Sequence, residues 1–479
     1  MKLPFGIVSI QQRYVVVAMM FFTLAVVFSL RVSFPIVLTQ MVYVPNVNPD
    51  ESHLTNNVII CPVQNDTESV GKPETVVSLL INNTDRYQWS QKLQGVVLSS
   101  FYYGNIFSEI PASILVQRYG AKILLLTSLA LSALVTILTP MAVEYGEAYG
   151  LIATRVLLGF VQGPIFPCLA AFVVPWYPVE ERGRLCSFGY IGISAGAALA
   201  SFASGLLLHN FGRWDITFYF FTVILVLLWI SFAFLCYEKP QDHPFISDEE
   251  KEYLQQKIEH YENERRNLSS TPWIAIIKCS PVWALILSTA LYSWSFSIIN
   301  TDLPKYLNDV LHVSIDKNGI YSSVPKILSI IVSTGSGIVS DLLLSKYHID
   351  RTLVRKIFVV LTSIIPATFL MSASYAGCNE LLAVIFFTIS ISAHGFNSVG
   401  AAINLYDLAP NYVAPLNAVI NSLATFVGLL TPFIAGVLTP NALLSEWRTV
   451  FWITFSLHLM ESVIFTIFGS AVTQKWNSS

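Results

Sequence analysis

Long apolar stretches recur along this chain and restrict its fold more than any other feature of the sequence. Windows of about 20 apolar residues, the length of a helix that crosses a bilayer, can be placed at twelve positions in the 479 residues. With only 12% charged residues, against about 25% in soluble proteins, the sequence predicts an all-α polytopic membrane protein. The twelve predicted spans lie near residues 14–42, 93–117, 122–142, 149–175, 185–209, 215–237, 275–302, 318–345, 354–375, 379–404, 412–438 and 447–470.

Two long hydrophilic connections divide the predicted spans. The first, residues 43–91, follows span one, and the second follows span six. The second connection separates six spans from another six, so we expect two halves of equal size. The predicted parts are an N-terminal six-helix half, a cytoplasmic linker and a C-terminal six-helix half, at residues 1–237, 238–271 and 272–479.

The distribution of lysine and arginine places both termini in the cytoplasm. In that orientation the inner segments hold 17 Lys and Arg residues and the outer segments seven, as the positive-inside rule requires. The loop 43–91 is then outside, where its sequons at Asn65 and Asn82 are expected to be glycosylated. The sequon at Asn267 is cytoplasmic and should stay unmodified. Residues 247–266 of the linker open with a Ser-Asp-Glu-Glu capping signature and predict a solvated helix across the inner face.

Two arginines, Arg31 and Arg155, each lie within an otherwise uncharged apolar stretch. A guanidinium cannot be deprotonated in a protein, and placing it near the middle of a membrane costs at least about 2.5–3.5 kcal/mol. Such residues normally face a bundle interior or a wet cavity, so the pair predicts a site for anions. The alternative is that each arginine pairs with helix carbonyls or with an acidic neighbour.

Several classes of function are disfavoured by composition. The balance of 27 basic and 30 acidic residues argues against a nucleic-acid partner. The six cysteines contain no CxxC pair, so neither a zinc site nor a disulfide framework is indicated. No HExxH, paired-carboxylate or nucleophile pattern occurs within the spans. We therefore expect no enzyme activity, no metal site, no catalytic residue and no cofactor.

One motif occurs in both halves. The segment from Ala112 to Lys122 follows span two, and the segment from Gly335 to Asp341 ends span eight. Both resemble the loop signature GxLaDrxGrk of the major facilitator superfamily. The resemblance implies two pseudo-symmetric halves, with Arg118, Lys122 and Asp341 at an inner gate; the first copy has Gln117 in place of the acidic residue.

Seven further motifs, in order along the chain, resemble one branch of that superfamily. They are similar to the anion:cation symporters, which include sodium-phosphate cotransporters, sialin and vesicular glutamate transporters. The long loop and short tails are most similar to invertebrate inorganic phosphate cotransporters. The motifs are Arg31-Val32-Ser33, Tyr87-Gln88-Trp89-Ser90, Ser100-Phe101-Tyr102-Tyr103-Gly104, Arg155 to Gly163, Trp176 to Arg182, Asn404 to Pro410 and Glu446 to Phe451.

The resemblance assigns substrate binding to Arg31 and Arg155, and we expect Tyr103, Gln162, Tyr292, Lys326 and Asn404 to complete the set. Gln162 stands where proton-linked members carry glutamate, so an amide excludes proton coupling through that position.

Other departures from the family bear on substrate and coupling. Leu98 and Tyr292 replace a histidine and an arginine of vesicular glutamate transporters, which argues against glutamate selectivity. Lys326 is an additional cation that could bind anion or take part in proton coupling; the alternative is snorkelling. His394 and Glu461 are interpreted as buried polar residues with hydrogen-bond partners at a bundle seam.

The sequence thus predicts a secondary active transporter of small anions, inorganic phosphate or organic, that works by alternating access. The family implies sodium as the coupling ion. A proton-coupled, sialin-like organic-anion transporter is the alternative, and an anion channel ranks below both because channels do not need paired halves. We expect a monomer in the lipid bilayer. The ten residues before Gln11 contain no acidic dileucine signal, which favours the plasma membrane.

Overall fold

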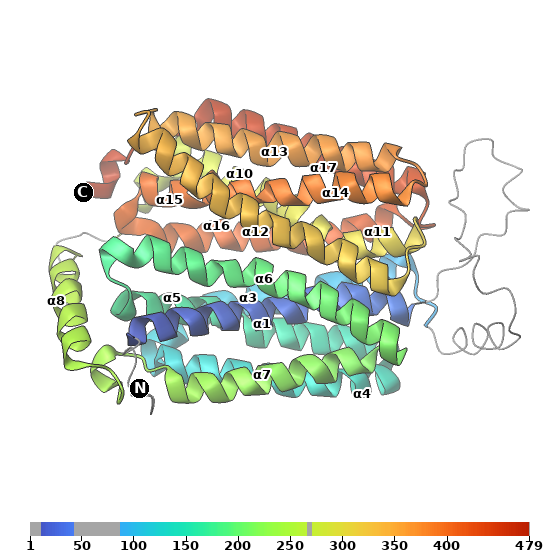
Figure 1. The fold of residues 1–479 in the computed structure, drawn as a ribbon, viewed down its shortest axis with the longest axis horizontal. Coiled ribbons are helices and arrows are strands. Elements are labelled where there is room, and N and C mark those ends of the chain that lie inside the picture. Colours follow the sequence, from blue (N-terminus) through green and yellow to red (C-terminus); the bar gives the residue numbers. More distant parts are fainter. Residues whose placement is uncertain (1–10, 43–86, 266–270, 479) are drawn as a thin grey trace, which may run out of the picture.

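The computed structural model describes residues 11–42, 87–265 and 271–478, and these are almost entirely helical (Figure 1). Among them, ten helical segments are long and apolar enough to cross a membrane. One of the ten, Ala121–Val173, has 53 residues and covers two predicted spans, 122–142 and 149–175. Helix α3 (Gln91–Tyr119) occupies the predicted span 93–117. The all-α polytopic membrane fold is confirmed.

The first six predicted spans form one bundle. Helix α1 packs against α6 and α7, and α3 and α7 pack against α4. Helix α4 is two helices joined at Glu147, where the backbone leaves helical geometry with φ 45°. The bounds are α1 Gln12–Met41, α3 Gln91–Tyr119, α4 Ala121–Gln162, α5 Ile165–Trp176, α6 Val179–Phe211 and α7 Asp215–Leu235.

The last six predicted spans form a second bundle, in which α10 packs against α16 and α17, and α13 packs against α14 and α17. Two of its spans change helix type midway, at the π-helix η3 and the 3-10 helix η4. The bounds are α10 Ser280–Ser297, η3 Ile298–Asp302, α11 Leu303–Asp309, α12 Ile315–Ser345, α13 Arg351–Tyr375, α14 Glu380–Ala393, η4 His394–Ser398, α15 Ala401–Leu408, α16 Val413–Leu438 and α17 Leu444–Phe468.

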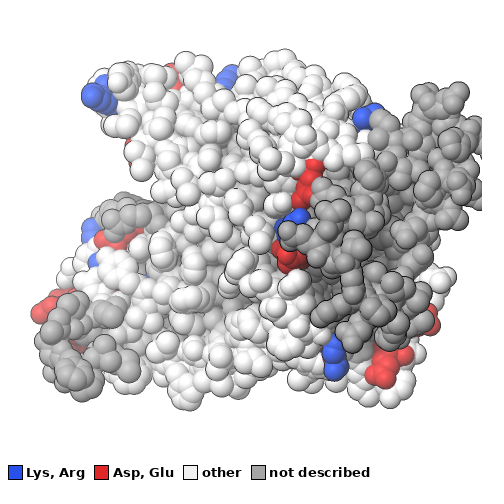
Figure 2. All heavy atoms as spheres, turned by 45° about the vertical axis from the view of Figure 1, so that its right-hand side comes forward, with Lys and Arg blue, Asp and Glu red and all other residues white. Residues whose placement is uncertain are grey.

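The two bundles meet through α6 against α12 and α3 against α16. At the outer ends, glycines of the two bundles lie close to one another. A Cβ placed on Gly205 of α6 would lie 2.8 Å from the Cα of Gly319 on α12, and one on Gly95 of α3 would lie 3.3 Å from the Cα of Gly436 on α16. At the inner end of α12, a Cβ on Gly335 would meet nothing within 4 Å. The outer end is therefore closed by glycine contacts. At the left edge of Figure 2, a notch separates the two lobes of the molecule.

Helix α8 (Asp248–Arg265) lies across the inner end of the first bundle (Figure 1). The Ser247 hydroxyl accepts from the Glu250 amide at 3.3 Å, as the capping signature predicted. The Glu250 carboxylate in turn accepts from the backbone amides of Gln12 and Arg13, at 2.8 and 3.0 Å. Because α8 caps α1 and lies against α5, it is attached to the first bundle.

The cysteine prediction is wrong in one respect. Cys378, between α13 and α14, is disulfide-bonded, whereas the other described cysteines, Cys168, Cys186, Cys236 and Cys279, form no disulfide. Disulfides form in oxidising compartments, so this bond is consistent with placing the α13–α14 connection outside. The spacing of scattered cysteines carried no signal for it.

Between its left end and its centre, the surface in Figure 2 is almost free of charged side chains, as expected for a face in contact with lipid, whereas a group of charged side chains lies just right of the centre, beside the grey residues. The predicted glycosylation sites Asn65 and Asn82, and Asn267, lie outside the described residues.

Candidate functional site

Arg31 of α1 and Arg155 of α4 both lie against one aromatic ring. The guanidinium carbon of Arg31 is 4.4 Å from the centre of the Phe101 ring, and that of Arg155 is 5.7 Å from it. Arg155 also stacks on Phe34 at 4.0 Å, and Arg31 on Phe28 at 4.8 Å. The structure therefore brings the two predicted arginines into one site, and Phe101 is the shared residue.

Neither arginine forms an ion pair within 4.0 Å in the described part of the chain, so the acidic-neighbour alternative fails there. The Arg31 Nε donates to the Gln162 amide oxygen at 3.4 Å. One guanidinium nitrogen of Arg31, the Nε of Arg155 and the Gln162 amide nitrogen are buried without a hydrogen-bond partner. Buried donors of this kind are rare and costly, and here they are concentrated around a single ring. The arrangement can bind a small anion.

Tyr102, rather than the predicted Tyr103, accompanies the two arginines. Tyr103 is 41% exposed, whereas Tyr102 interacts electrostatically with both Arg31 and Arg155 and reaches Ser297 of α10 in the second bundle. Successive residues of a helix point about 100° apart, so only one of the two tyrosines can face the arginines. The Ser-Phe-Tyr-Tyr-Gly motif did not indicate which.

The second bundle contributes three predicted residues at separate places. Tyr292 of α10 lies against His394, with ring centres 5.2 Å apart. Lys326 of α12 is buried and donates to the Ser201 hydroxyl of α6 at 2.8 Å, so it bridges the bundles rather than snorkelling. Asn404 of α15 is fully buried, and neither its amide nitrogen nor its amide oxygen has a partner.

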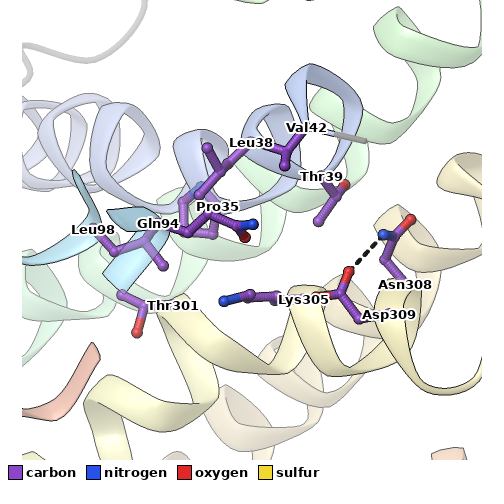
Figure 3. Close-up of a pocket in the computed structure, with 10 residues that line it drawn as sticks. All are labelled: Pro35, Leu38, Thr39, Val42, Gln94, Leu98, Thr301, Lys305, Asn308 and Asp309. Carbon is purple, nitrogen blue, oxygen red and sulfur yellow. Dashed lines mark hydrogen bonds between the residues drawn. The ribbon is translucent and has the colours of Figure 1, made fainter. Parts of the chain in front are cut away.

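A small cavity lies between the bundles on the outer side of Arg31 (Figure 3). Its volume is about 10 Å³, room for about one water molecule. Lys305 of α11, one of the seven Lys and Arg residues that the orientation count assigned to outer segments, is buried in the cavity wall and points into the cavity. Beside it, the Gln91 amide of α3 donates to the Asp309 carboxylate at 3.2 Å, a hydrogen bond from one bundle to the other. These contacts close the route from Arg31 to the outside.

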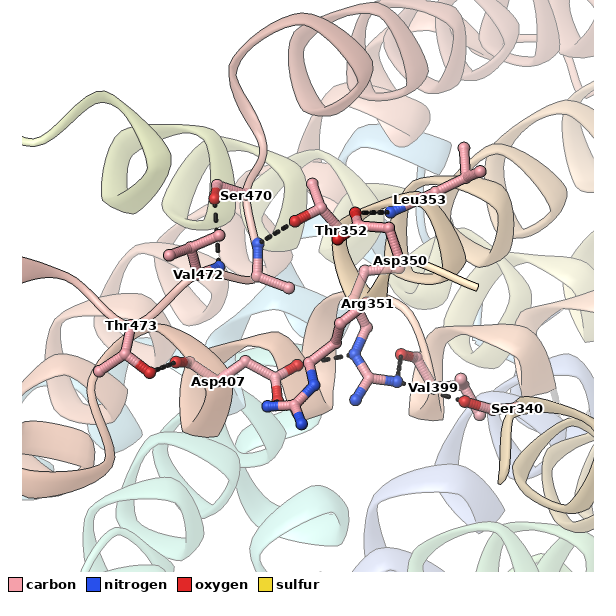
Figure 4. A network of polar contacts seen from close by, with 12 residues as sticks. Ser340, Asp350, Arg351, Thr352, Leu353, Val399, Asp407, Ser470, Val472 and Thr473 are labelled. Carbon is pink, nitrogen blue, oxygen red and sulfur yellow. Dashed lines mark hydrogen bonds and ion pairs between the residues drawn. The ribbon is translucent and has the colours of Figure 1, made fainter. Parts of the chain in front are cut away.

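The inner end of the second bundle carries a charge network that the sequence did not reveal (Figure 4). Arg355 of α13 donates to the Asp407 carboxylate at 2.7 Å, and also to Ser340 and to the Val399 carbonyl. Arg351 lies 3.6 Å from the same carboxylate. Asp407 belongs to the Asn404–Pro410 motif, so its charge was visible, but its partners were not.

The three predicted gate residues lie at the inner ends of their helices without joining this network. Arg118 lies over the Tyr119 ring at 5.5 Å, and Lys122 over the Tyr237 ring at 3.8 Å. Asp341 is exposed on α12 and forms no ion pair within 4.0 Å with any residue that the structure describes. In the same ranges, no three His, Cys, Asp or Glu side chains converge as a metal site would require.

The sequence pattern of the Major Facilitator Superfamily matches residues 14–432. The chain belongs to this superfamily. It is 33% identical to human sialin over 467 residues, which cover 97% of the chain and 90% of sialin. It is also 33% identical to the sodium-dependent phosphate transport protein 1 of the mouse over 404 residues, 84% of the chain and 86% of that protein. The family predicted from the motifs is confirmed, and the protein is a membrane transporter.

Solved structures of other Major Facilitator Superfamily transporters share the fold. A bacterial homologue of the human lysosomal transporter Spinster, in an inward-facing and unoccupied conformation, superposes with a TM-score of 0.63 at 13% identity, covering 96% of this chain and 97% of that one. A D-xylose-proton symporter gives the same TM-score at 13% identity, covering 95% and 99%. At such identities the likeness establishes the architecture.

Proposed function

We propose that this transporter carries small anions by alternating access, with Arg31 and Arg155 binding the anionic group. The observation that carries the proposal is the shared ring: both guanidiniums lie on Phe101, and no carboxylate of the described residues forms an ion pair with either within 4.0 Å. Partly unsatisfied guanidinium donors in a membrane interior favour an anion that supplies several oxygens at once.

Carboxylate and phosphate groups both meet this requirement, because a guanidinium binds either one through two parallel hydrogen bonds. The names of relatives point the same way, since one of them is a sodium-dependent phosphate transport protein. We propose inorganic phosphate and organic anions as the substrate classes, with Tyr102, Gln162, Tyr292, Lys326 and Asn404 contributing polar contacts on the two sides.

A coupled carrier fits the geometry better than a channel. Glycine contacts close the outer end between the bundles, and the Gln91–Asp309 bond lies outside the arginines. A carrier opens such contacts in turn on each side of a fixed site. We propose cation-coupled symport, with Na⁺ or H⁺ as the coupling ion, by a monomer in the plasma membrane; surface biotinylation in transfected cells tests the compartment.

The test is uptake by liposomes that contain the purified full-length protein. Labelled phosphate, urate, glutamate and sialic acid are offered in separate assays, with and without a sodium gradient, and labelled xylose serves as the uncharged control. We expect saturable uptake of phosphate or of an organic anion and none of xylose. The absence of uptake of all four anions would defeat the proposal, whether or not xylose is taken up.

A further inference from the structure

A second buried polar cluster lies in the C-terminal bundle, on α10, η4 and α17. His458 Nδ1 and Glu461 Oε2 of α17 are 3.0 Å apart, and the other oxygen of Glu461 accepts from the Ser288 hydroxyl at 3.2 Å. The rings of His458 and His394 have centres 5.8 Å apart. His394 Nε2 lies 3.3 Å from the hydroxyl of Ser295. Two histidines and one glutamate thus form a connected group along one face of α10.

These groups are shielded from solvent and only partly satisfied. Glu461 is 0% exposed, His458 1% and His394 7%. His394 Nδ1 and His458 Nε2 are buried without a hydrogen-bond partner. Both His394 and Glu461 therefore have the hydrogen-bond partner that the sequence interpretation gave them, and His394 has in addition a ring nitrogen without one.

Charge burial determines what this cluster can hold. An ionised carboxylate away from water is very costly unless it is paired. No lysine or arginine lies within 4.0 Å of Glu461 in the described ranges, so its charge can be compensated only by a proton, on its own oxygen or on His458. With one proton the pair is neutral overall at short range, and without it the pair carries an uncompensated negative charge.

The other titratable residues on the packed helices do not face this group. Lys326 donates to Ser201, Arg351 and Arg355 bind Asp407, and Arg448 donates to the Ser374 carbonyl. Tyr292, whose ring lies on His394, is the exception. The remaining ones lie toward the helix ends: Glu446 of α17, Glu380 of α14, Lys356 and Tyr375 of α13, Tyr406 of α15, and Asp316, Lys317, Tyr321 and Asp341 of α12.

We propose that the His458–Glu461 pair, with His394, is a proton-binding site that couples proton movement to anion transport. This role rests on the proposed function. The site that binds protons in proton-linked relatives is an amide here, Gln162, whereas this cluster supplies the missing proton acceptor in the opposite bundle. Tyr292 connects the cluster to the bundle interface, since its ring lies on His394. The next residue of α10, Ser293, lies beside Gly428, and Ser297 of the same helix contacts Tyr102 of the first bundle.

The proton balance of one cycle is simple. A proton from the outside binds the pair while the outer end is open and the anion binds Arg31 and Arg155. The proton and the anion are both released inside after the two bundles rock against each other. The carrier then returns to the outward-open state with the His458–Glu461 pair either protonated again or without a proton. A carrier that returns without its proton and anion performs net symport, whereas exchange of one anion for another needs no deprotonation.

The experiment compares Glu461→Gln and His458→Gln with two matched controls, Glu144→Gln and His209→Gln, which change the same residue types at exposed positions. Full-length protein is placed in liposomes with the membrane potential shunted, and the anion transported from the panel above is used. An inward gradient of one pH unit should support about tenfold accumulation for a one-to-one symport. We expect this for the parent and for both controls.

In Glu461→Gln and His458→Gln we expect accumulation close to unity, while exchange of external for internal anion continues at near the parent rate. Infrared difference spectra of the parent between acidic and neutral pH should show a buried carboxyl band that Glu461→Gln removes. Parent-like proton-driven accumulation in both variants would overturn the proposal, as would an unchanged carboxyl band. A parent that moves none of the four anions would defeat the proposed function, and with it the coupling; the infrared band then still decides whether the pair binds a proton.

Discussion

Both arginines are stabilised by aromatic rings, and Arg31 also by the Gln162 amide; neither forms an ion pair with a carboxylate of the described residues. A cation over an aromatic face gains roughly 0.5–2 kcal/mol, which offsets part of the cost of burying Arg31 and Arg155 without occupying their hydrogen-bond donors. A carboxylate partner would satisfy those donors and compete with substrate. The aromatic environment therefore holds the charges in place and leaves them able to bind.

Replacing Arg31 by lysine tests whether geometry or charge matters at this position. Lysine keeps the positive charge but cannot make two parallel hydrogen bonds to one anionic group. We expect a several-fold higher KM for anion uptake in Arg31→Lys, with unchanged surface expression. A KM equal to that of the parent would mean that the site needs only a charge.

Replacing Gln162 by glutamate tests the coupling argument. The new carboxylate would lie beside Arg31, whose Nε is 3.4 Å from the present amide oxygen. When ionised it pairs with Arg31 and hinders the anion, and when protonated it releases Arg31. Uptake by Gln162→Glu should therefore rise more steeply than that of the parent as external pH falls. An identical pH profile would exclude this position from coupling.

At the scale of residues, the sequence predicted which charged residues belong to the site better than it predicted their contacts. Arg31 and Arg155 were found because a charge within an apolar stretch is visible in the linear sequence alone. Phe101 was one aromatic residue among many, and the choice of Tyr102 over Tyr103 depends on helix rotation. Asp407 takes its role from partners on α13, and Lys305 from a cavity that α1 and α3 also line, and no local pattern encodes these contacts. His458 and Glu461 do have the i,i+3 spacing of one helix face, but the contact with His394 comes from another element.

At the scale of elements, a carboxylate on α8 caps the first transmembrane helix. Glu250 accepts from two α1 amides that have no intrahelical partner. Hydrogen bonds to charged groups contribute about 1.5–3 kcal/mol each, so Glu250→Ala should lower the melting temperature of the purified protein. Glu249→Ala, at the exposed neighbouring residue, should leave it unchanged. Equal melting temperatures for the two variants would mean that α8 adds no stability to α1.

The outer closure depends on glycine at the contact between α6 and α12. Any side chain on Gly319 would collide with Gly205, since a Cβ there lies 2.8 Å from its Cα. Gly319→Val should therefore favour the outward-open arrangement. A cysteine introduced at Asn308, which lines the outer cavity, should then react several-fold faster with an impermeant maleimide added outside.

Gly335→Val is the matched control on the same helix, because a Cβ there meets nothing within 4 Å. It should leave the labelling rate at the parent value. A Gly319→Val variant that labels no faster than this control would show that the glycine contact does not hold the outer end closed.

Helix existence was predictable and helix breaks were not. All twelve predicted apolar spans coincide with helical segments, because twenty apolar residues in a bilayer have little alternative to a helix. The change to a π-helix at Ile298–Asp302 and to a 3-10 helix at His394–Ser398 arises within continuous apolar patterns. Such changes depend on how neighbouring helices satisfy the backbone, so the pattern gave no sign of them.

At the scale of the whole molecule, the site assignments depend on orientation. With both termini inside, Asn65 and Asn82 face the lumen during synthesis and should carry glycans, and Asn267 should not. Mutating the first two to glutamine should remove the glycosidase-sensitive mass shift and leave transport intact. A glycan on Asn267 would invert the orientation and place Cys378 in the cytoplasm, against its disulfide.

The most direct test of the account is anion uptake by liposomes containing Arg31→Ala or Arg155→Ala protein. Removing a buried charge relieves an insertion cost, so both variants should be produced and elute as monodisperse protein. We predict that each loses saturable uptake of the anion that the parent carries, and that it also loses anion exchange. Uptake at the parent rate by both variants would contradict the assignment of the two arginines as the anion site.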